Sequence, residues 1–146
     1  MAINASKVVV GGLAAGIVAN LIGYVGFGML LGPRFEAEAV AVAPALAGRG
    51  MSGSAIATQV VISFIIGMLL VWLYAAIRPR FGPGPKTDVY AALVVWVCGF
   101  VFHIDLLLTG LATTTTYAMA SVVALVQLLV SAWVGAMLYK EDAATA

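Results

Sequence analysis

Long, uninterrupted runs of apolar residues dominate the pattern along the chain. Crossing a hydrocarbon core of about 30 Å takes roughly 20 apolar residues in a helix, and four runs reach that length. Because the apolar residues do not alternate with polar ones, and because open strands leave backbone groups unpaired in lipid, the runs predict helices. The predicted spans are Val8–Leu31, Ala55–Ile77, Asp88–Leu108 and Thr115–Tyr139. The expected fold class is therefore an all-α, integral membrane four-helix bundle that forms a single domain over residues 1–146.

Two connections between the spans carry structural signals. The segment Arg78–Thr87, RPRFGPGPKT, is rich in proline and glycine, which predicts a stiff turn between the second and third helices. A basic contact with lipid headgroups is the alternative. The outer loop, residues 32–54, is predicted to hold a short helix on the outer membrane surface that begins at Pro33 and ends near Pro44. The same letters, EAEAVAVA, also alternate like a strand.

Composition supports the membrane class and narrows the functions that remain. Hydrophobic residues make up 64% of the chain and charged residues 9%, with a mean hydropathy of +1.13. Soluble domains are about 45–50% apolar and about 25% charged. The composition therefore excludes a soluble globule, and it excludes disordered tails and nucleic-acid-binding modules, which need more charge. A single cysteine, Cys98, excludes a disulfide framework.

The distribution of basic residues predicts the orientation of the bundle, because short loops rich in Lys and Arg stay in the cytoplasm. The amino terminus, the turn between the second and third spans and the carboxyl terminus share one side of the membrane. That side carries most of the basic residues, namely Lys7, Arg78, Arg80, Lys86 and Lys140 against Arg34 and Arg49. Both termini are therefore expected in the cytoplasm.

Small residues and buried polar groups mark the faces through which helices pack in lipid, where no hydrophobic force draws helices together. One polar residue on each span belongs to such a face: Asn20, Ser63, His103 and Gln127. At 1.5 Å per residue, each of them lies roughly 18–22 Å above the cytoplasmic end of its helix. The sequence therefore predicts one shared layer of polar groups in the outer half of the bilayer.

Two interpretations of this layer stay open. It is a hydrogen-bonded layer that fixes the register between helices, or it is a ligand site in which polar groups orient one end of an apolar molecule. The second interpretation selects as cofactor-binding residues His103, Asn20, Gln127, Ser63, Gly16, Gly99 and Trp96. Trp96 also fits an interfacial belt of aromatic residues with Trp72 and Trp133.

His103 is the only histidine in the chain. Its imidazole can be the axial ligand of a chlorophyll magnesium or a haem iron, donate to a quinone or carotenoid oxygen, or pass protons; the plainer interpretation is a packed side chain. Asp105 is the one carboxylate well inside the predicted spans, which makes it a functional candidate. Two residues turn a helix by about 200°, so Asp105 and His103 are expected on opposite faces and not as a dyad.

Several chemistries are missing from the sequence. It holds no glycine-rich phosphate loop, no metal-ligand pair at helical spacing and no Ser/His/Asp order. It also lacks the paired intramembrane charges of proton-driven carriers. We therefore do not expect an enzyme, a catalytic residue, or a metal site other than axial ligation by His103.

The central turn also carries a family resemblance. The segment Leu73–Leu93, LYAAIRPRFGPGPKTDVYAAL, followed by Trp96, resembles a group of small, uncharacterised bacterial four-helix integral membrane proteins. The resemblance covers the turn well and the other helices only through their Gly/Ala character, and it implies the fold but no activity and no site. By analogy of size and composition alone, the chain is similar in build to pigment-binding accessory subunits of photosynthetic reaction centres.

These observations lead to one expected function and two alternatives. The chain is expected to be a non-catalytic accessory subunit of a larger complex in the bacterial inner membrane. It would hold an apolar cofactor, such as a carotenoid, a (bacterio)chlorophyll or another isoprenoid, or a lipid, in Gly/Ala-lined grooves. The alternatives are a small oligomeric transporter or channel that uses Asp105 and His103, and a purely structural scaffold. Expected partners are membrane lipids and other integral membrane subunits or further copies of the chain, without nucleic acid.

Overall fold

The computed structural model describes residues 3–139, and within that range the chain is helical and contains no strand. Lys140, which contributes to the predicted orientation, lies outside the described residues. Four segments of the described range are long and apolar enough to cross a membrane: Ala5–Leu30, Gly53–Phe81, Pro85–Leu108 and Thr114–Leu138. The prediction of an all-α chain with four such segments is therefore confirmed.

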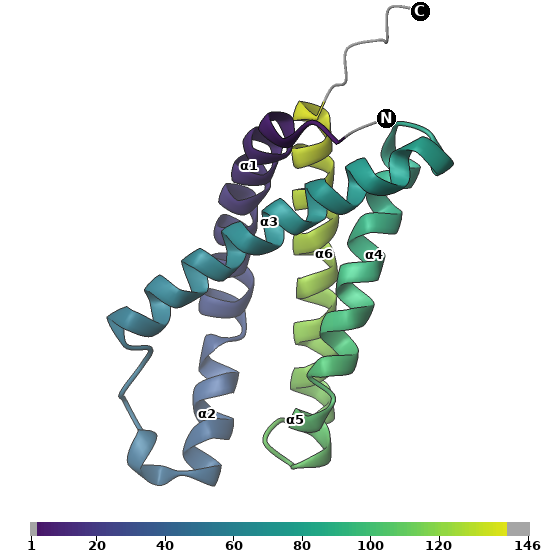
Figure 1. Ribbon diagram of the computed structural model, residues 1–146. Helices are drawn as coiled ribbons and strands as arrows, with labels where there is room; N and C mark the ends of the chain where they lie inside the picture. Colours follow the sequence, from purple (N-terminus) through teal and green to yellow (C-terminus); the bar gives the residue numbers. More distant parts are fainter. Residues whose placement is uncertain (1–2, 140–146) are drawn as a thin grey trace, which may run out of the picture.

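Eight helical elements make up the described chain (Figure 1). In chain order they are α1 (Ala5–Gly23), the π-helix η1 (Tyr24–Leu30), α2 (Gly32–Val42), the 3-10 helix η2 (Pro44–Leu46), α3 (Gly53–Phe81), α4 (Pro85–Phe102), α5 (Asp105–Leu108) and α6 (Thr114–Leu138). The start of α1, the α3–α4 turn and the end of α6 lie at one end of the bundle, called here the terminal end. The helices α2 and α5 lie at the opposite end.

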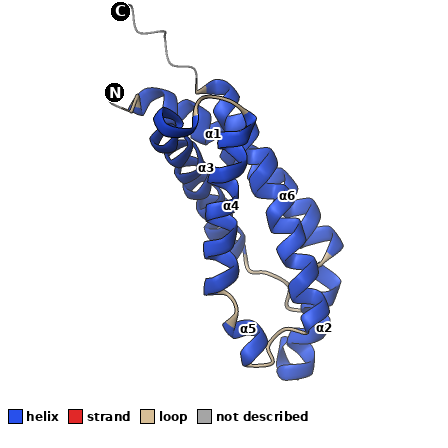
Figure 2. Cartoon of the chain, turned by 90° about the vertical axis from the view of Figure 1, so that its right-hand side faces the viewer, coloured by secondary structure: helices blue, strands red, loops and turns tan. Residues whose placement is uncertain are grey.

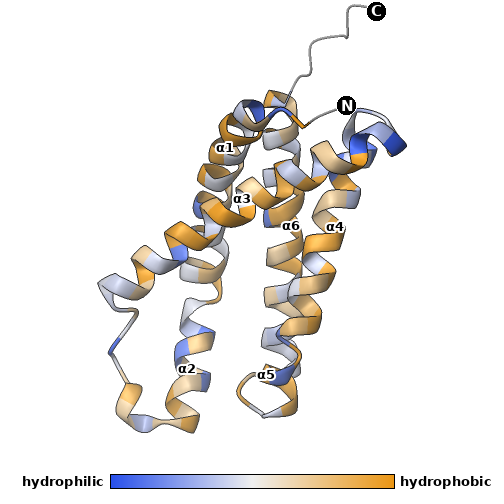
Figure 3. Cartoon of the chain, viewed as in Figure 1, coloured by the Kyte–Doolittle hydropathy of each residue, from blue (hydrophilic) through white to orange (hydrophobic). Residues whose placement is uncertain are grey.

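Helix α1 packs against both α3 and α6, and α4 packs mainly against α6 (Figures 1 and 2). Figure 1 shows α3 crossing the other long helices obliquely, so that its first half stands away from α2. Apolar side chains cover the long helices on the surface as well as inside, while hydrophilic residues gather towards the ends and loops (Figure 3). This distribution is typical of helices whose outer faces contact lipid.

Side-chain caps set the starts of three helices. The Asn4 side chain accepts a hydrogen bond from the backbone N–H of Lys7 (3.1 Å) at the start of α1. Ser52 and Thr113 cap α3 and α6 in the same way, by accepting from backbone N–H groups three residues later. Each cap satisfies one of the N–H groups that the first turn of a helix leaves without an intrahelical partner.

Glycines allow the backbones around α1 to approach closely. A Cβ atom on Gly67 of α3 would lie 2.5 Å from both the carbonyl oxygen of Gly12 and the backbone nitrogen of Gly16. On the other side of α1, a Cβ atom on Gly11 would lie 2.6 Å from the carbonyl oxygen of Gly135 of α6. Helix α1 is thus fixed between α3 and α6 by contacts that only glycine permits, which is a common way to pack helices in lipid.

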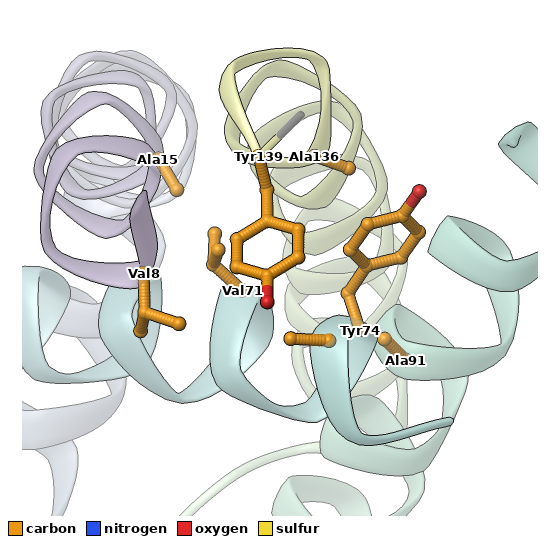
Figure 4. Packing of buried hydrophobic residues seen from close by; sticks show 8 residues of the cluster. Val8, Ala15, Val71, Tyr74, Ala91, Ala136 and Tyr139 are labelled. Atoms are coloured by element: carbon orange, nitrogen blue, oxygen red, sulfur yellow. The ribbon is translucent and has the colours of Figure 1, made fainter. Parts of the chain in front are cut away.

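Two clusters of buried apolar residues complete the core. The first lies towards the terminal end, where Tyr74 and Tyr139 meet edge to face at 6.1 Å between ring centroids (Figure 4). The hydroxyls of these tyrosines accept hydrogen bonds from the backbone N–H groups of Gly84 and Asn4, respectively. The second cluster joins α3, α4 and α6 through Leu70, Ala92, Leu128 and Ala132.

Several predicted boundaries of the second and third spans are wrong, and each has a local reason. Helix α3 continues past Ile77 and through Pro79 to Phe81, although this proline lacks the N–H for one helical hydrogen bond. It ends at Gly82, whose φ of +84° favours glycine. Helix α4 already begins at Pro85, a residue well suited to a first turn. The third span does end at Leu108, as predicted, but it is divided into α4, which ends at Phe102, and the short α5.

The outer loop contains the predicted short helix, since α2 runs from Gly32 to Val42 with a proline in its first turn. The direction of α2 differs from the prediction of a helix that lies on the outer membrane surface. Figures 1 and 2 show α2 continuing away from the first span towards the start of α6, and not lying across the bundle. The π-helix η1 joins the two segments, and the backbone N–H of Leu31 still bonds to Gly26 at the wide π spacing (3.0 Å).

The close approach of α1 and α3 predicts that Gly67→Ala destabilises the bundle. A methyl group there meets backbone atoms that cannot rotate away, and such overpacking costs about 1–3 kcal/mol. Thermal unfolding in detergent, followed by circular dichroism, measures the loss as a lower Tm. Gly99→Ala is the matched control, because a Cβ atom there meets nothing within 4 Å. Equal Tm values for the two variants would contradict the packing described.

Candidate functional site

A partly enclosed cavity of about 340 Å³ lies between α4 and α6, towards the end of the bundle that holds α2 and α5. Every one of the four candidate spans contributes to its wall, and α2 and α5 contribute one residue each. Aromatic rings form much of that wall: Phe27, Phe35, Trp96, Phe100 and Tyr117. Small residues provide the remaining space: Gly99, Ala112, Ala120 and Ala124. The polar side chains of the wall, apart from Trp96 and Tyr117, are those of His103, Ser121 and Gln127.

Three of the rings form a continuous series from α4 to α6. Trp96 stacks on Phe100 with 5.8 Å between centroids and 30° between planes. Phe100 in turn contacts Tyr117 at 5.3 Å. Aromatic contacts of this kind add to the energy of simple burial, so this side of the cavity is a preformed, rigid surface.

Hydrogen bonds from the wall to backbone carbonyls hold the surrounding helices together. The indole N–H of Trp96 donates to the carbonyl oxygen of Ser121 on α6 (2.8 Å). In the reverse direction, the hydroxyl of Tyr117 donates to the carbonyl oxygen of Phe100 on α4 (2.7 Å). The amide nitrogen of Gln127 donates to the carbonyl oxygen of Ala19 on α1 (2.7 Å). The cavity is therefore framed by two opposed hydrogen bonds between α4 and α6 and by a third bond to α1.

His103 lies where α4 ends. Its backbone leaves the helix (φ −101°, ψ 7°), and its N–H still bonds to the carbonyl oxygen of Gly99 (3.1 Å). The ring atom Nδ1 lies 2.8 Å from the same oxygen. A carbonyl oxygen only accepts hydrogen bonds, so in the neutral ring Nδ1 carries the hydrogen and Nε2 carries the lone pair. The side chain is exposed and forms part of the cavity wall.

The structure brings together four of the predicted cofactor-binding residues, His103, Gln127, Gly99 and Trp96, in the wall of this one cavity. Trp96 differs from Trp72 and Trp133, which are 49% and 52% exposed. Its indole faces α6 and does not extend a surface belt.

The other three predicted residues, Asn20, Ser63 and Gly16, lie outside the cavity wall, at the contact between α1 and α3. The amide of Asn20 donates to the carbonyl oxygens of Gly16 (2.9 Å) and Val60 (3.4 Å). Ser63 is buried and donates to the carbonyl oxygen of Gln59 within its own helix (3.0 Å). The polar groups of the expected layer thus bond to backbone carbonyls and not to one another.

Asp105 begins the short helix α5 and is exposed, and it does not line the cavity. The expectation that it shares one helix with His103 is wrong, because the chain leaves the helical conformation between them. Among residues 3–139, no group of three or more His, Cys, Asp and Glu side chains is placed to hold a metal ion.

Sequence reasoning missed several wall residues, and only some of them had a usable signal. Trp96 and Phe100 are four residues apart, as are Tyr117 and Ser121, so helical spacing alone places each pair on one face. Phe27 and Phe35 had no such signal. Their directions depend on the π-helix η1 and on the path of α2, which no periodicity in the sequence indicates.

A carboxylate of α2 fixes this helix to the start of α6. The hydroxyl of Thr113 donates to Glu38 Oε1 (2.6 Å), and its backbone N–H lies 3.4 Å from Oε2. Hydrogen bonds from Thr113, and then from Thr116, lower the pKa of the Glu38 carboxyl below its ordinary value of 4.5, with a smaller contribution from Arg34. The contact holds in place the helix that contributes Phe35 to the cavity wall.

No family model, no curated protein and no solved structure matches the chain. The arrangement of the residues in the cavity wall offers flat apolar surfaces, a histidine ring held in one orientation and little free charge, which suits the binding of an apolar molecule with one polar end.

The bond from Trp96 to Ser121 predicts that Trp96→Phe loosens the contact between α4 and α6. Interhelical hydrogen bonds in membrane proteins contribute about 0.6 kcal/mol on average, so we expect a modest decrease in Tm. Thermal unfolding in detergent tests this, with Trp72→Phe as the control because that indole is half-exposed and belongs to the outer surface. A larger decrease for the Trp72 variant would contradict the assignment.

The contact between Glu38 and Thr113 predicts a pH-dependent position of α2. Because the folded-state pKa is lowered, the contact stabilises the fold above the unfolded value near 4.5 and is lost as the pH falls through the folded value. Two spin labels are attached to cysteines that replace Ala41 and Ala118 in a Cys98→Ser background. The distribution of distances between the labels should broaden when the pH falls below 4.5. Glu38→Gln should remove this dependence, whereas Glu36→Gln should retain it. Identical acid responses in both variants would contradict the prediction.

Proposed function

We propose that this chain is a multi-pass membrane protein that holds the ring of an apolar, isoprenoid-type ligand in the cavity between α4 and α6. It acts as a non-catalytic accessory subunit of a larger membrane complex. The observation that carries the proposal is the composition of one cavity wall, where five aromatic side chains surround the only histidine of the chain. The ring of that histidine is held by its hydrogen bond to Gly99.

The size of the cavity supports a ligand ring over a whole pigment. At about 340 Å³ it lies near the lower end of the range of about 300–1,000 Å³ that is usual for small-molecule sites. One substituted six-membered ring, such as the end of a carotenoid or the headgroup of an isoprenoid quinone, suits this space. A complete chlorophyll-type macrocycle would extend well beyond it, and only its edge could enter.

The surface and the charges support the membrane placement within this proposal. Apolar side chains are exposed along all four candidate spans, which favours contact with lipid. Lys7, Arg78, Arg80 and Lys86 belong to the terminal end, which favours both termini in the cytoplasm. With this orientation the cavity lies in the half of the bilayer away from the cytoplasm, where the tail of an isoprenoid ligand can extend into lipid through its open side.

The two other hypotheses differ in their support. A transporter that uses Asp105 together with His103 has no support from the cavity, because Asp105 is not part of its wall. A purely structural scaffold is favoured by the glycine contacts of α1. The scaffold hypothesis needs no ligand, so the presence or absence of a bound molecule separates it from the proposal.

The proposal predicts that the protein, purified from its native membrane in mild detergent, carries a near-stoichiometric isoprenoid-type molecule. Solvent extraction followed by absorption spectroscopy and mass spectrometry detects it. Ala124→Phe should reduce the bound amount at least several-fold, because its ring fills the cavity. Val94→Phe should not, because Val94 lies on the outer surface of α4.

Bulk phospholipid alone in the extract of the wild-type protein would refute the proposal and leave the scaffold. Equal retention of an isoprenoid by both phenylalanine variants would show that the molecule binds elsewhere on the protein.

A further inference from the structure

Four hydrogen-bond donors of the cavity wall are already used. Trp96 Nε1, Tyr117 Oη, Gln127 Nε2 and His103 Nδ1 each bond to a backbone carbonyl, at distances of 2.7–2.8 Å. An indole N–H and a phenol O–H each donate only once. The wall therefore presents aromatic and imidazole faces to a ligand, while the N–H and O–H groups of these four side chains bond to the protein.

The groups that remain are mainly acceptors. The neutral ring of His103 keeps a lone pair on Nε2, because its single hydrogen is on Nδ1. The amide nitrogen of Gln127 faces α1, where it lies 2.9 Å from the position that a Cβ atom on Gly23 would occupy. The amide oxygen of Gln127 accepts no hydrogen bond from a described residue. The hydroxyl of Ser121 both donates and accepts, so it does not discriminate between ligands.

A ligand that enters such a site must supply the hydrogen. A ketone or quinone oxygen beside His103 Nε2 places two acceptors against each other, and neither gains a hydrogen bond in place of the one it made to water, which is costly. A hydroxyl donates to His103 Nε2 and pairs both groups. Resting on the proposed function, we infer that the bound ring belongs to an isoprenoid alcohol, with a hydroxyl at its polar end in contact with His103, and not to a keto-isoprenoid or a quinone.

The test uses β-ionol and β-ionone, which share one ring and one carbon skeleton and differ in having a hydroxyl or a ketone. Equilibrium dialysis against phosphatidylcholine nanodiscs with and without the protein gives binding above simple partition into lipid. One neutral hydrogen bond is worth about a factor of ten at most in affinity. We therefore expect β-ionol to bind several-fold, and up to about ten-fold, more tightly than β-ionone.

His103→Phe should abolish this preference while β-ionone still binds, because phenylalanine keeps the apolar wall and removes the lone pair. The retained binding of β-ionone shows that the loss of the preference in this variant is not misfolding.

The outcomes separate the two proposals. Equal binding of the two probes, tighter binding of β-ionone, or an unchanged preference in His103→Phe overturns the inference and leaves the ligand cavity in place. Binding of neither probe, together with an extract from the native membrane that holds only bulk phospholipid, overturns the proposed function and the inference with it. A magnesium tetrapyrrole in that extract, with neither probe bound, would indicate that the Nε2 lone pair of His103 binds a metal, and it also overturns the inference.

Discussion

Hydrogen bonds from side chains to backbone carbonyls are the interaction on which the arrangement of this bundle depends. In an apolar surrounding, a polar group that finds no partner is costly, and the carbonyls of neighbouring helices are the acceptors that are always present. Asn20 reaches α3 in this way, Gln127 reaches α1, and the pair Trp96 and Tyr117 joins α4 to α6 in both directions. The same use of donors leaves acceptor atoms in the wall of the cavity between α4 and α6, among them His103 Nε2. The need to pair side-chain donors with backbone carbonyls thus affects both how the helices pack and which atoms a ligand meets in the cavity.

The cavity follows from a change in residue size along the bundle. Near the terminal end, glycines bring α1 into backbone contact with α3 and α6. Towards the other end, large rings from α4 and α6 keep the helices apart, while Gly99 and Ala124 leave the space between them open. Helix α4 then stops at Phe102, and α2 is held on the opposite side by Glu38. Small residues therefore have two opposite effects here: they close one end of the bundle and open the other.

The fold was more predictable from the sequence than the site. Continuous apolar runs locate the four candidate spans, because membrane helices must satisfy their backbone groups internally. The ends of these helices were harder to predict. Helix α3 continues through Pro79, and α4 ends where the side chain of His103 bonds to the carbonyl oxygen of Gly99. For the site, polarity and spacing found His103, Gln127, Gly99 and Trp96 but also selected Asn20, Ser63 and Gly16, which serve the contact of α1 with α3. Depth along a helix gives the level of a side chain; its direction depends on how the helices cross, which the sequence does not encode locally. Phe27 and Phe35 depend in addition on the π-helix η1.

Nitrogen NMR of labelled histidine, with the protein in nanodiscs at alkaline pH, shows which nitrogen of the His103 imidazole carries the hydrogen. Because the chain contains one histidine, the spectrum reports on this ring alone. We predict a protonated Nδ1 and an unprotonated Nε2, with the Nε2 resonance shifting when β-ionol is added. A protonated Nε2 and a lone pair on Nδ1 would contradict this prediction, because the ring would then not be held by the carbonyl of Gly99 and would offer the ligand a donor.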